Sequence, residues 1–313
     1  MFSRDFIVGM VYLLQTAVGI LGNFYLLYHY LFLYLTGYRV RSTGVIFRHL
    51  TIANSLVIFS KGVLQTMAAF GMNFSLSDVE CKLVFYVHRV GRGVSINTTS
   101  LLSVFQVIII NPRNSRYAEF KAKALKYMDL SNILCWILHM MLNIMVPMKM
   151  TGQWSNKNIT RRDYGFCYAE DHNNVIEYLL YTILLLFPDV FCLMLMLWAS
   201  SSMIFILHRH RQQVQHIHRT SVSCKSAPET RATQNTLVLV STFVSSYTLS
   251  SIFHGCFAFL NKPNFWLVNA STLIAACFPM VSPFILMSRN SSASRFSLAW
   301  IRNIKLPKLK RNT

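Results

Sequence analysis

The sequence predicts an all-α membrane protein in which seven transmembrane helices form one bundle. Three observations favour this fold: an apolar composition, seven long apolar stretches, and an uneven distribution of lysine and arginine. Of 313 residues, 53% are hydrophobic and only 13% are charged, about half the roughly 25% charged share of soluble domains. A soluble fold of this length could not bury so much apolar surface, so part of that surface is expected to face lipid.

Each of the seven stretches is long enough to cross a membrane as a helix, which takes about 20 residues. The first contains no charged residue and is far longer than the apolar region of about 7–15 residues in a signal peptide, so we expect it to be retained. No stretch alternates apolar and polar residues at period two, which favours helices over a barrel. The predicted spans cover residues 6–35, 45–70, 81–110, 128–148, 175–207, 236–260 and 265–287.

Lysine and arginine gather on one side of these spans. The loops after the first, third and fifth spans and the C-terminal tail hold two-thirds of the 30 basic residues, and the opposite loops hold fewer than a quarter. Because cytoplasmic loops are the basic ones, the N-terminus is predicted outside and the C-terminus inside, which requires an odd number of spans. The net charge of +19 then reflects contact with anionic lipid rather than with nucleic acid.

The chain divides into a transmembrane domain over residues 1–290 and a cytoplasmic tail over 291–313. In the tail, Phe296, Trp300 and Ile304 recur every four residues, which predicts a short amphipathic helix on the inner leaflet. No sequence repeat of 20–50 residues is visible, and this weakens a transporter interpretation. No phosphate-binding loop, metal-ligand spacing or nucleophile elbow is found, so we expect no enzyme, no cofactor and no metal site.

Two cysteines and one asparagine on the outer side carry modification signals. Cys81, at the start of the third span, and Cys167, in the second outer loop, are the only cysteines predicted to face the oxidising side. A disulfide between them would hold that loop over the mouth of the bundle; the alternative is two free thiols. Asn158, in Asn158-Ile159-Thr160, is the most plausible glycosylation site, unless the sequon is unused.

The layout resembles the rhodopsin-type receptors, with informative departures. The matching positions are Gly22-Asn23, Asn54, Cys81, Trp136, Pro188 and Ser282-Pro283-Phe284. Phe105-Gln106-Val107 replaces the Asp-Arg-Tyr of that plan, and the sixth span contains no proline. We also expect the polar side chains of Asn23, Asn54 and Ser282 to bridge the first, second and seventh spans.

Over nearly its whole length the sequence is similar to the vomeronasal type-1 receptors. The matching strings are Ser60-Lys61-Gly62, Gln65-Thr66-Met67-Ala68-Ala69-Phe70-Gly71, His88-Arg89-Val90-Gly91-Arg92-Gly93, Ser103-Val104-Phe105-Gln106, Asn158-Ile159-Thr160, Ser241-Thr242-Phe243-Val244-Ser245 and Ser282-Pro283-Phe284. The resemblance implies a G-protein-coupled pheromone receptor in the plasma membrane, with a small-molecule ligand and an inhibitory-class heterotrimeric G protein as partners. The alternatives are another chemosensory receptor, of the bitter-taste type, and a transporter or channel.

Ionisable residues within the spans are the candidates for ligand binding, because each is costly to insert into a membrane. Arg89, with His88 and Arg92 nearby, is expected to pair with an anionic or polar ligand such as a sulfated steroid or a carboxylic acid. The alternative is an internal ion pair with Asp189 or Glu177, for which Lys61 competes. Tyr181 is a candidate for an apolar pocket wall; the alternative is ordinary packing or a place in the aromatic belt at the membrane interface.

The expected G-protein cleft lies at the opposite, cytoplasmic end of the bundle. Phe105 and Gln106 stand at the inner end of the third span, and Arg209 and Arg211 continue the fifth span into a basic loop. These four residues are expected to frame the cleft. The alternative is that the two arginines only fix the orientation of the chain in the membrane.

Overall fold

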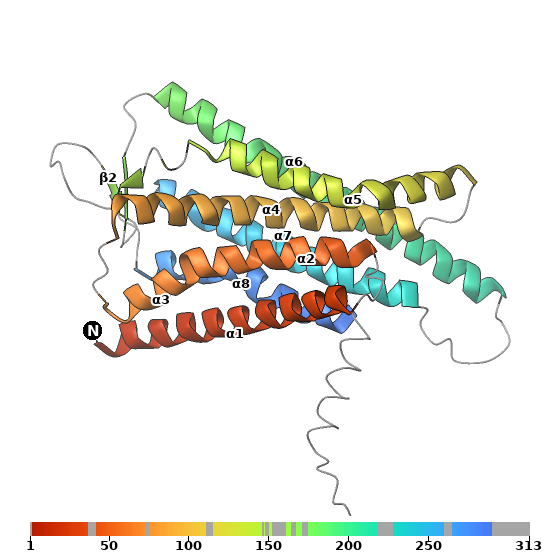
Figure 1. Ribbon diagram of the computed structural model, residues 1–313, viewed down its shortest axis with the longest axis horizontal. Coiled ribbons are helices and arrows are strands. Elements are labelled where there is room, and N and C mark those ends of the chain that lie inside the picture. The colour runs from red at the N-terminus through yellow and green to blue at the C-terminus, as the bar shows by residue number, and fades with distance from the viewer. Residues whose placement is uncertain are drawn as a thin grey trace, which may run out of the picture.

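The computed structural model describes eleven segments of the chain, and their helices form seven rods in one bundle (Figure 1). The described residues are 2–36, 42–72, 76–110, 115–145, 147, 150–151, 161–163, 167–170, 175–217, 228–259 and 265–289. The helices are α1 (Phe2–Leu35), α2 (Ser42–Val57), α3 (Val63–Ala69), α4 (Asp78–Ile110), α5 (Ser115–Leu142), α6 (Val175–Ile217), α7 (Pro228–Phe259) and α8 (Phe265–Arg289). A π-helical turn, η1 (Ile58–Gly62), joins α2 to α3 in one continuous rod.

Within the described residues, four helices are long and apolar enough to cross a membrane. They contain the segments Phe6–Leu35, Asp78–Ile110, Ile183–Arg209 and Asn269–Ser288. The exterior is correspondingly apolar: on α6, Phe187, Phe191 and Trp198 are each more than half exposed. A run of large exposed apolar side chains has no place on a water-soluble monomer, so this surface is suited to lipid.

Three helices extend well beyond the predicted spans, one of them being α7, which begins at Pro228 rather than at 236. The helix α6 continues to Ile217 rather than ending at residue 207, and α5 begins at Ser115 rather than at 128. Hydropathy marks only the apolar part of a helix, whereas the backbone hydrogen bonds of a helix continue into polar sequence. The other end of α5 is earlier than predicted: the Ile144 N–H bonds the Met141 carbonyl at 3.3 Å, a tight turn that ends the helix before Pro147.

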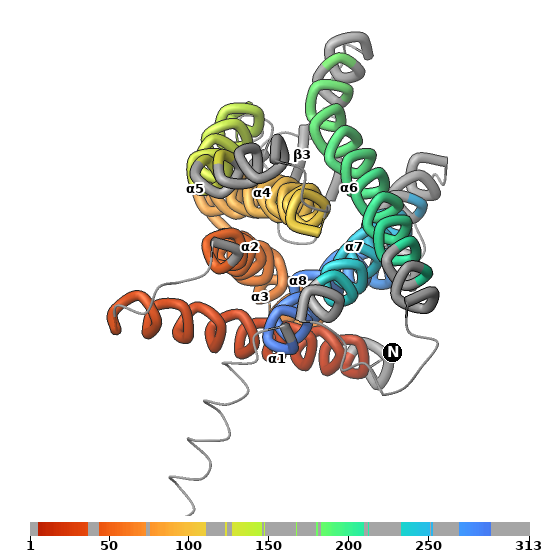
Figure 2. The backbone as a smooth tube through the Cα atoms, turned by 90° about the vertical axis from the view of Figure 1, so that its right-hand side faces the viewer, coloured from red at the N-terminus to blue at the C-terminus, as the bar shows by residue number. Residues whose placement is uncertain are grey.

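The helix α4 occupies the centre of the bundle, beside α2, α5, α6 and α7 (Figure 2). Two of its buried hydroxyl groups are satisfied within the helix: Thr99 donates to the Ser95 carbonyl and Ser103 to the Thr99 carbonyl, both at 2.8 Å. The Ser95 hydroxyl bonds Asn54 on α2, whereas the buried Thr98 hydroxyl has no hydrogen-bond partner among the described residues. The main core packs around α4 and includes Leu26, Leu50, Leu102, Met196, Leu239 and Phe278.

A small antiparallel sheet, which the sequence did not predict, lies at the same end of the bundle as the N-terminus (Figure 1). Its strands are β1 (Met150–Thr151), β2 (Arg161–Asp163) and β3 (Tyr168–Glu170), in the order β1-β3-β2. Strands of two or three residues are too short to show a periodic pattern. Cys167, directly before β3, is joined by a disulfide to Cys81 in α4, with the two Cα atoms 5.9 Å apart. The disulfide fastens the sheet to the central helix.

Candidate functional site

Two of the cavities formed by described residues lie side by side within the bundle, and both are lined by Val57, His88 and Arg92. The first, of about 50 Å³, also has Ser95, Phe243, Ser246, Tyr247, Ser250, Ala275, Phe278 and Pro279 in its wall. The second, of about 70 Å³, has Gln15, Thr16, Ile58, Lys61, Gly62, Gln65, Ser271, Thr272, Ala275 and Ala276. Since pockets for drug-sized ligands span roughly 300–1,000 Å³, a ligand of that size requires the side chains to move apart.

The helix α4 places His88 and Arg92 on the cavity side because residues four apart share a helix face. Arg92 follows Cys81 by eleven residues, which is about 16 Å along the helix axis. That depth is near the middle of a hydrocarbon core of about 30 Å. The polar part of the cavity wall is therefore deep within the bundle rather than at its rim.

Arg89, which the sequence grouped with Arg92, contacts a different neighbour. Its Nε donates a hydrogen bond to Oδ1 of Asn143, the residue directly after α5, at 3.3 Å. The Asn143 amide in turn donates to the His139 carbonyl at 2.8 Å. Arg89 thus takes part in the contact between α4 and α5, and it is not among the residues that line the two cavities.

Arg92 lies over an aromatic ring from α7. The guanidinium carbon is 5.0 Å from the centre of the Tyr247 ring, and the Tyr247 hydroxyl donates to Asp189 Oδ2 on α6 at 3.2 Å. Within the described part of the chain, Asp189 forms no ion pair with a basic side chain within 4 Å. The internal Arg–Asp189 pair considered above is therefore replaced by an Arg–Tyr–Asp chain, and the side chain of Glu177 lies outside the described residues.

Lys61 enters the second cavity from the π-helical turn η1. Its Nζ is 5.4 Å from the centre of the Phe85 ring on α4. The preceding residue, Ser60, donates to the Leu56 carbonyl at 2.6 Å and lies 3.4 Å from His88 Nδ1. Sequence reasoning treated Lys61 as a competitor for carboxylates or, in a transporter or channel, as part of a solute pathway. The sequence signal for a functional role was the presence of a lysine in an apolar span. The direction of its side chain, however, depends on η1. Turns of this π-helical kind are frequent at functional sites.

Polar ties connect the helices just beyond the cavities. Asn54 Nδ2 donates to Ser282 Oγ on α8, and Ser95 Oγ on α4 donates to Asn54 Oδ1, both at 2.7 Å. Asn23 Nδ2 on α1 donates to the Pro279 carbonyl of α8 at 2.9 Å. The predicted bridging by Asn23, Asn54 and Ser282 is confirmed. Because Ser95 also lines the first cavity, the cavity wall is joined directly to this three-helix connection.

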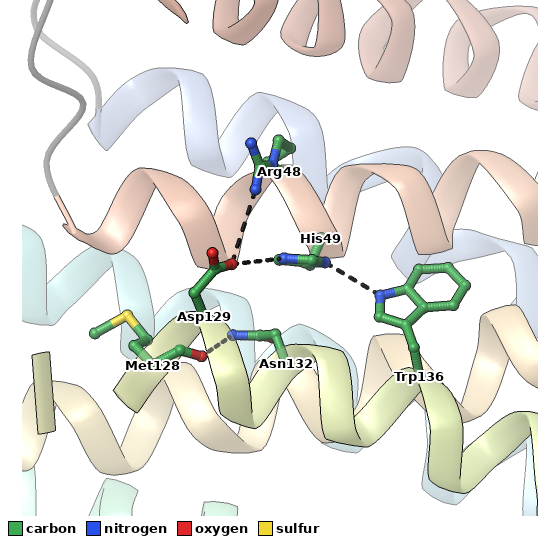
Figure 3. A network of polar contacts seen from close by, with 6 residues as sticks. All are labelled: Arg48, His49, Met128, Asp129, Asn132 and Trp136. Atoms are coloured by element: carbon green, nitrogen blue, oxygen red, sulfur yellow. Dashed lines mark hydrogen bonds and ion pairs between the residues drawn. The ribbon is translucent and has the colours of Figure 1, made fainter. Parts of the chain in front are cut away.

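A second network fastens α2 to α5 (Figure 3). His49 Nε2 lies 3.2 Å from Asp129 Oδ1, Arg48 lies 3.8 Å from the same oxygen, and Trp136 Nε1 donates to His49 Nδ1 at 3.2 Å. Since His49 accepts at Nδ1, the proton is assigned to Nε2, which points to the carboxylate. Arg48 and Asp129 are both well exposed, whereas the Trp–His bond is partly buried and therefore better shielded from water.

The residues expected at the G-protein cleft are only partly described. Phe105 and Gln106 are buried in the interior of α4, and Arg209 is exposed on the C-terminal extension of α6. The side chains of Arg211 and Tyr181, and the whole of Asn158, lie outside the described residues.

The fold and the cavities define a helical membrane protein with a polar, cation-lined site among its helices. The model of the vomeronasal organ pheromone receptor family matches residues 6–299, and the chain belongs to this family. It is 56% identical to vomeronasal type-1 receptor 4 of Homo sapiens over 96% of this chain and 100% of the relative. It is 52% identical to vomeronasal type-1 receptor 3 of Homo sapiens, over 99% of this chain and 100% of the relative. A more distant relative is vomeronasal type-1 receptor 45 of Mus musculus, 31% identical over 88% of this chain and 86% of the relative.

Proposed function

We propose that the protein is a pheromone receptor of the plasma membrane that binds a small chemosensory ligand within the bundle and activates an inhibitory-class heterotrimeric G protein. Membership of the vomeronasal organ pheromone receptor family supports the receptor role. The observation that carries the ligand site is the pair of adjoining cavities that share His88 and Arg92. A polar site enclosed by helices is a usual setting for small-molecule recognition.

The proposed topology has seven spans, with the N-terminus outside and the C-terminus inside. Its support is the seven helical rods of the described chain together with the bias of lysine and arginine. In this orientation the sheet and the Cys81–Cys167 disulfide, at the N-terminal end of the bundle (Figure 1), face outward. We also place glycosylation at Asn158, in the outer segment between β1 and β2, and assign residues 291–313 to a cytoplasmic tail with an amphipathic helix.

The proposed ligand contacts centre on His88 and Arg92. Asp189 acts through Tyr247 at the edge of the first cavity, and Arg89 acts from the α4–α5 contact. Tyr181 precedes Asp189 by about two turns of α6 and is assigned to the apolar part of the wall. An unpaired ammonium ligand is disfavoured, because the cavity wall is already positively charged.

The proposed G-protein contact is at the end of the bundle opposite the sheet. The helix α6 extends well past its apolar part, to Ile217, and presents Arg209 to solvent; Arg211 follows on the same extension. Phe105 and Gln106, buried in α4, form the floor of the cleft. Movement of α4 or α6 relative to its neighbours would transmit ligand binding to this surface.

The experiment that tests the proposal is ligand-stimulated nucleotide exchange on a purified inhibitory-class G protein. Membranes that contain the full chain are exposed to a panel of volatile compounds, carboxylic acids and sulfated steroid-like compounds. We expect exchange to rise with at least one ligand. We expect this rise to be lost in Arg92→Ala when the variant and the wild type are present at the cell surface in equal amounts. No exchange despite surface expression, combined with solute flux or ionic current through the chain, would establish a transporter or channel instead.

The same assay separates two roles for Arg89. If Arg89 contacts the ligand, Arg89→Ala abolishes the response to anionic ligands and leaves the surface level unchanged. If its role is confined to the bond with Asn143 at the end of α5, the amount of receptor at the cell surface falls and the molecules that reach the surface respond normally.

A further inference from the structure

Two positively charged side chains from neighbouring helices line the second cavity, and the described part of the chain places no carboxylate between them. Lys61 comes from η1 and Arg92 from α4, and both line this cavity with His88. No carboxylate of a described residue lies within 4 Å of Lys61 or Arg92. Among the described side chains, the site therefore holds an excess of positive charge.

Such an arrangement is electrostatically unfavourable within a helix bundle. A cation far from water loses its hydration and needs an opposite charge or several hydrogen-bond acceptors in compensation. Lys61 has the face of Phe85 and Arg92 has the face of Tyr247. A ring quadrupole is a weaker partner than a full negative charge, so the rings leave most of the positive potential in the cavity uncompensated.

The neutral part of the wall is suited to the same kind of ligand. Gln65 Nε2 lies 3.4 Å from Thr272 Oγ1, so an amide and a hydroxyl are available at the cavity surface beside Lys61. Gln15, by contrast, is directed to the Leu273 carbonyl at 2.8 Å. The ammonium of Lys61 and the planar guanidinium of Arg92 donate hydrogen bonds and accept none. Two such groups that face the same cavity are suited to bind an oxyanion or a halide ion.

We propose that the second cavity binds an anionic group between Lys61 and Arg92. The group is either a free monovalent ion or the carboxylate of an organic ligand, and both offer the same charge to the same donors. The inference deepens the proposed function, since an organic anion at this place would be the receptor's ligand. In this proposal Arg92 binds the anion together with Lys61 and not with Arg89, whose Nε is hydrogen-bonded to Asn143.

The π-helical turn η1 gives this site its geometry. A π-turn inserts one extra residue into a helix and changes the direction of the side chains that follow. The next residue, Gly62, allows close approach of α1: a Cβ at this position would lie 3.0 Å from Thr16 Oγ1. Local backbone geometry and close packing of α1 thus hold Lys61 at the cavity.

The test is thermal unfolding of the purified full chain in detergent, in chloride-free buffer, with sodium chloride, sodium benzoate or neutral benzyl alcohol added. The variants are Lys61→Gln and Arg92→Gln, and the matched control is Lys82→Gln, a lysine of α4 outside both cavities. For the wild type and the control, we expect anions to raise the Tm by several degrees and benzyl alcohol to have no such effect. For both cavity variants, we expect an equal or higher Tm without anion and no rise with anion.

The outcomes distinguish a free ion from an organic anion, and both of these from an internal ion pair of Lys61 or Arg92. A rise with both salts identifies a free-ion site that accepts carboxylates, and a rise with benzoate alone identifies an organic ligand. An unchanged wild-type Tm with either salt overturns the proposal. It is also overturned if each cavity variant lowers the Tm in anion-free buffer yet keeps the rise, because a lysine or arginine in an internal pair behaves in this way. The unfolding assay contains no G protein, so its failure is distinct from failure of the receptor role.

Discussion

The guanidinium of Arg92 lies 5.0 Å from the centre of the Tyr247 ring, so α4 and α7 meet through a cation–π contact at the edge of the first cavity. The hydroxyl of the same tyrosine donates to Asp189 on α6. One aromatic residue therefore connects a partly buried cation with a partly buried carboxylate that lie on different helices. A ligand that displaces the ring alters the environment of both charges and the relative positions of three helices.

Removal of the Tyr247 hydroxyl is expected to destabilise the bundle through Asp189. In Tyr247→Phe the ring still covers Arg92, but the carboxylate loses its donor, which costs about 1–3 kcal/mol. Asp189→Asn keeps an acceptor for the tyrosine and is expected to cost less. Thermal unfolding of the two purified variants provides the comparison. A larger loss in Asp189→Asn than in Tyr247→Phe would show that the charge of Asp189, rather than the hydrogen bond, stabilises this contact.

Asn54 is expected to be the most sensitive member of the tie between α2, α4 and α8. Asn54→Ala removes both of its hydrogen bonds, to Ser282 and from Ser95. Interhelical hydrogen bonds in membranes average about 0.6 kcal/mol and reach about 1.7, so we expect a loss of about 1–3 kcal/mol in unfolding free energy. The control is Ser201→Ala, because the exposed Ser201 bonds only the Leu197 carbonyl of its own helix. Equal stability of the two variants would contradict a bridging role for Asn54.

Gly93 permits the close contact between α4 and α5. A Cβ at Gly93 would overlap the imidazole ring of His139, which is buried and cannot withdraw to solvent. We expect Gly93→Ala to cost about 1–3 kcal/mol, as overpacking of a core does, and to lower the yield of folded protein in detergent. Gly9→Ala is the control, since its new methyl group would lie 3.3 Å from the Phe70 ring. If the Gly93 variant matches this control, the α4–α5 contact is looser than the structure shows.

Loss of the disulfide is expected to destabilise the outer end of the bundle. Cys81 and Cys167 are 86 residues apart, and a cross-link over a loop of this length contributes about 3–5 kcal/mol in the loop-entropy model. Cys81→Ser, Cys167→Ser and the double variant should lower the Tm and the surface level to the same extent, because all three break one bond. Cys277→Ser, at a free cysteine, should behave as wild type. Additive losses in the double variant would show that the two residues act separately.

The sequence alone was sufficient to predict features that depend on a single segment of the chain. Apolar length indicated where the helices lie, since a long run of apolar residues has few other stable states in a membrane. The tie between Asn54 and Ser282 was also accessible, because a polar side chain within an apolar span needs a partner. Ser95, the third member, was missed: a helical serine can bond its own preceding turn, so its presence in a span does not require a partner on another helix.

Features that depend on tertiary contacts were not accessible from the sequence. Arg89 and Arg92 are three residues apart and were expected to act together, yet their long side chains reach Asn143, directly after α5, and Tyr247 on α7. The direction of Lys61 follows from the π-turn η1, which no residue pattern indicates. The three-stranded sheet consists of strands of two or three residues, and such strands form only because the disulfide and α4 hold them in place.

The most direct test that a ligand activates the receptor from this cavity is to measure how nucleotide exchange depends on ligand concentration. Wild type, Arg92→Gln and the control Lys82→Gln are compared at equal surface level with one activating ligand. We expect Arg92→Gln to shift the half-maximal concentration at least about tenfold, which corresponds to about 1.4 kcal/mol of binding free energy, and the control to remain unchanged. An unshifted curve for Arg92→Gln would show that the ligand acts elsewhere and would contradict the proposed site.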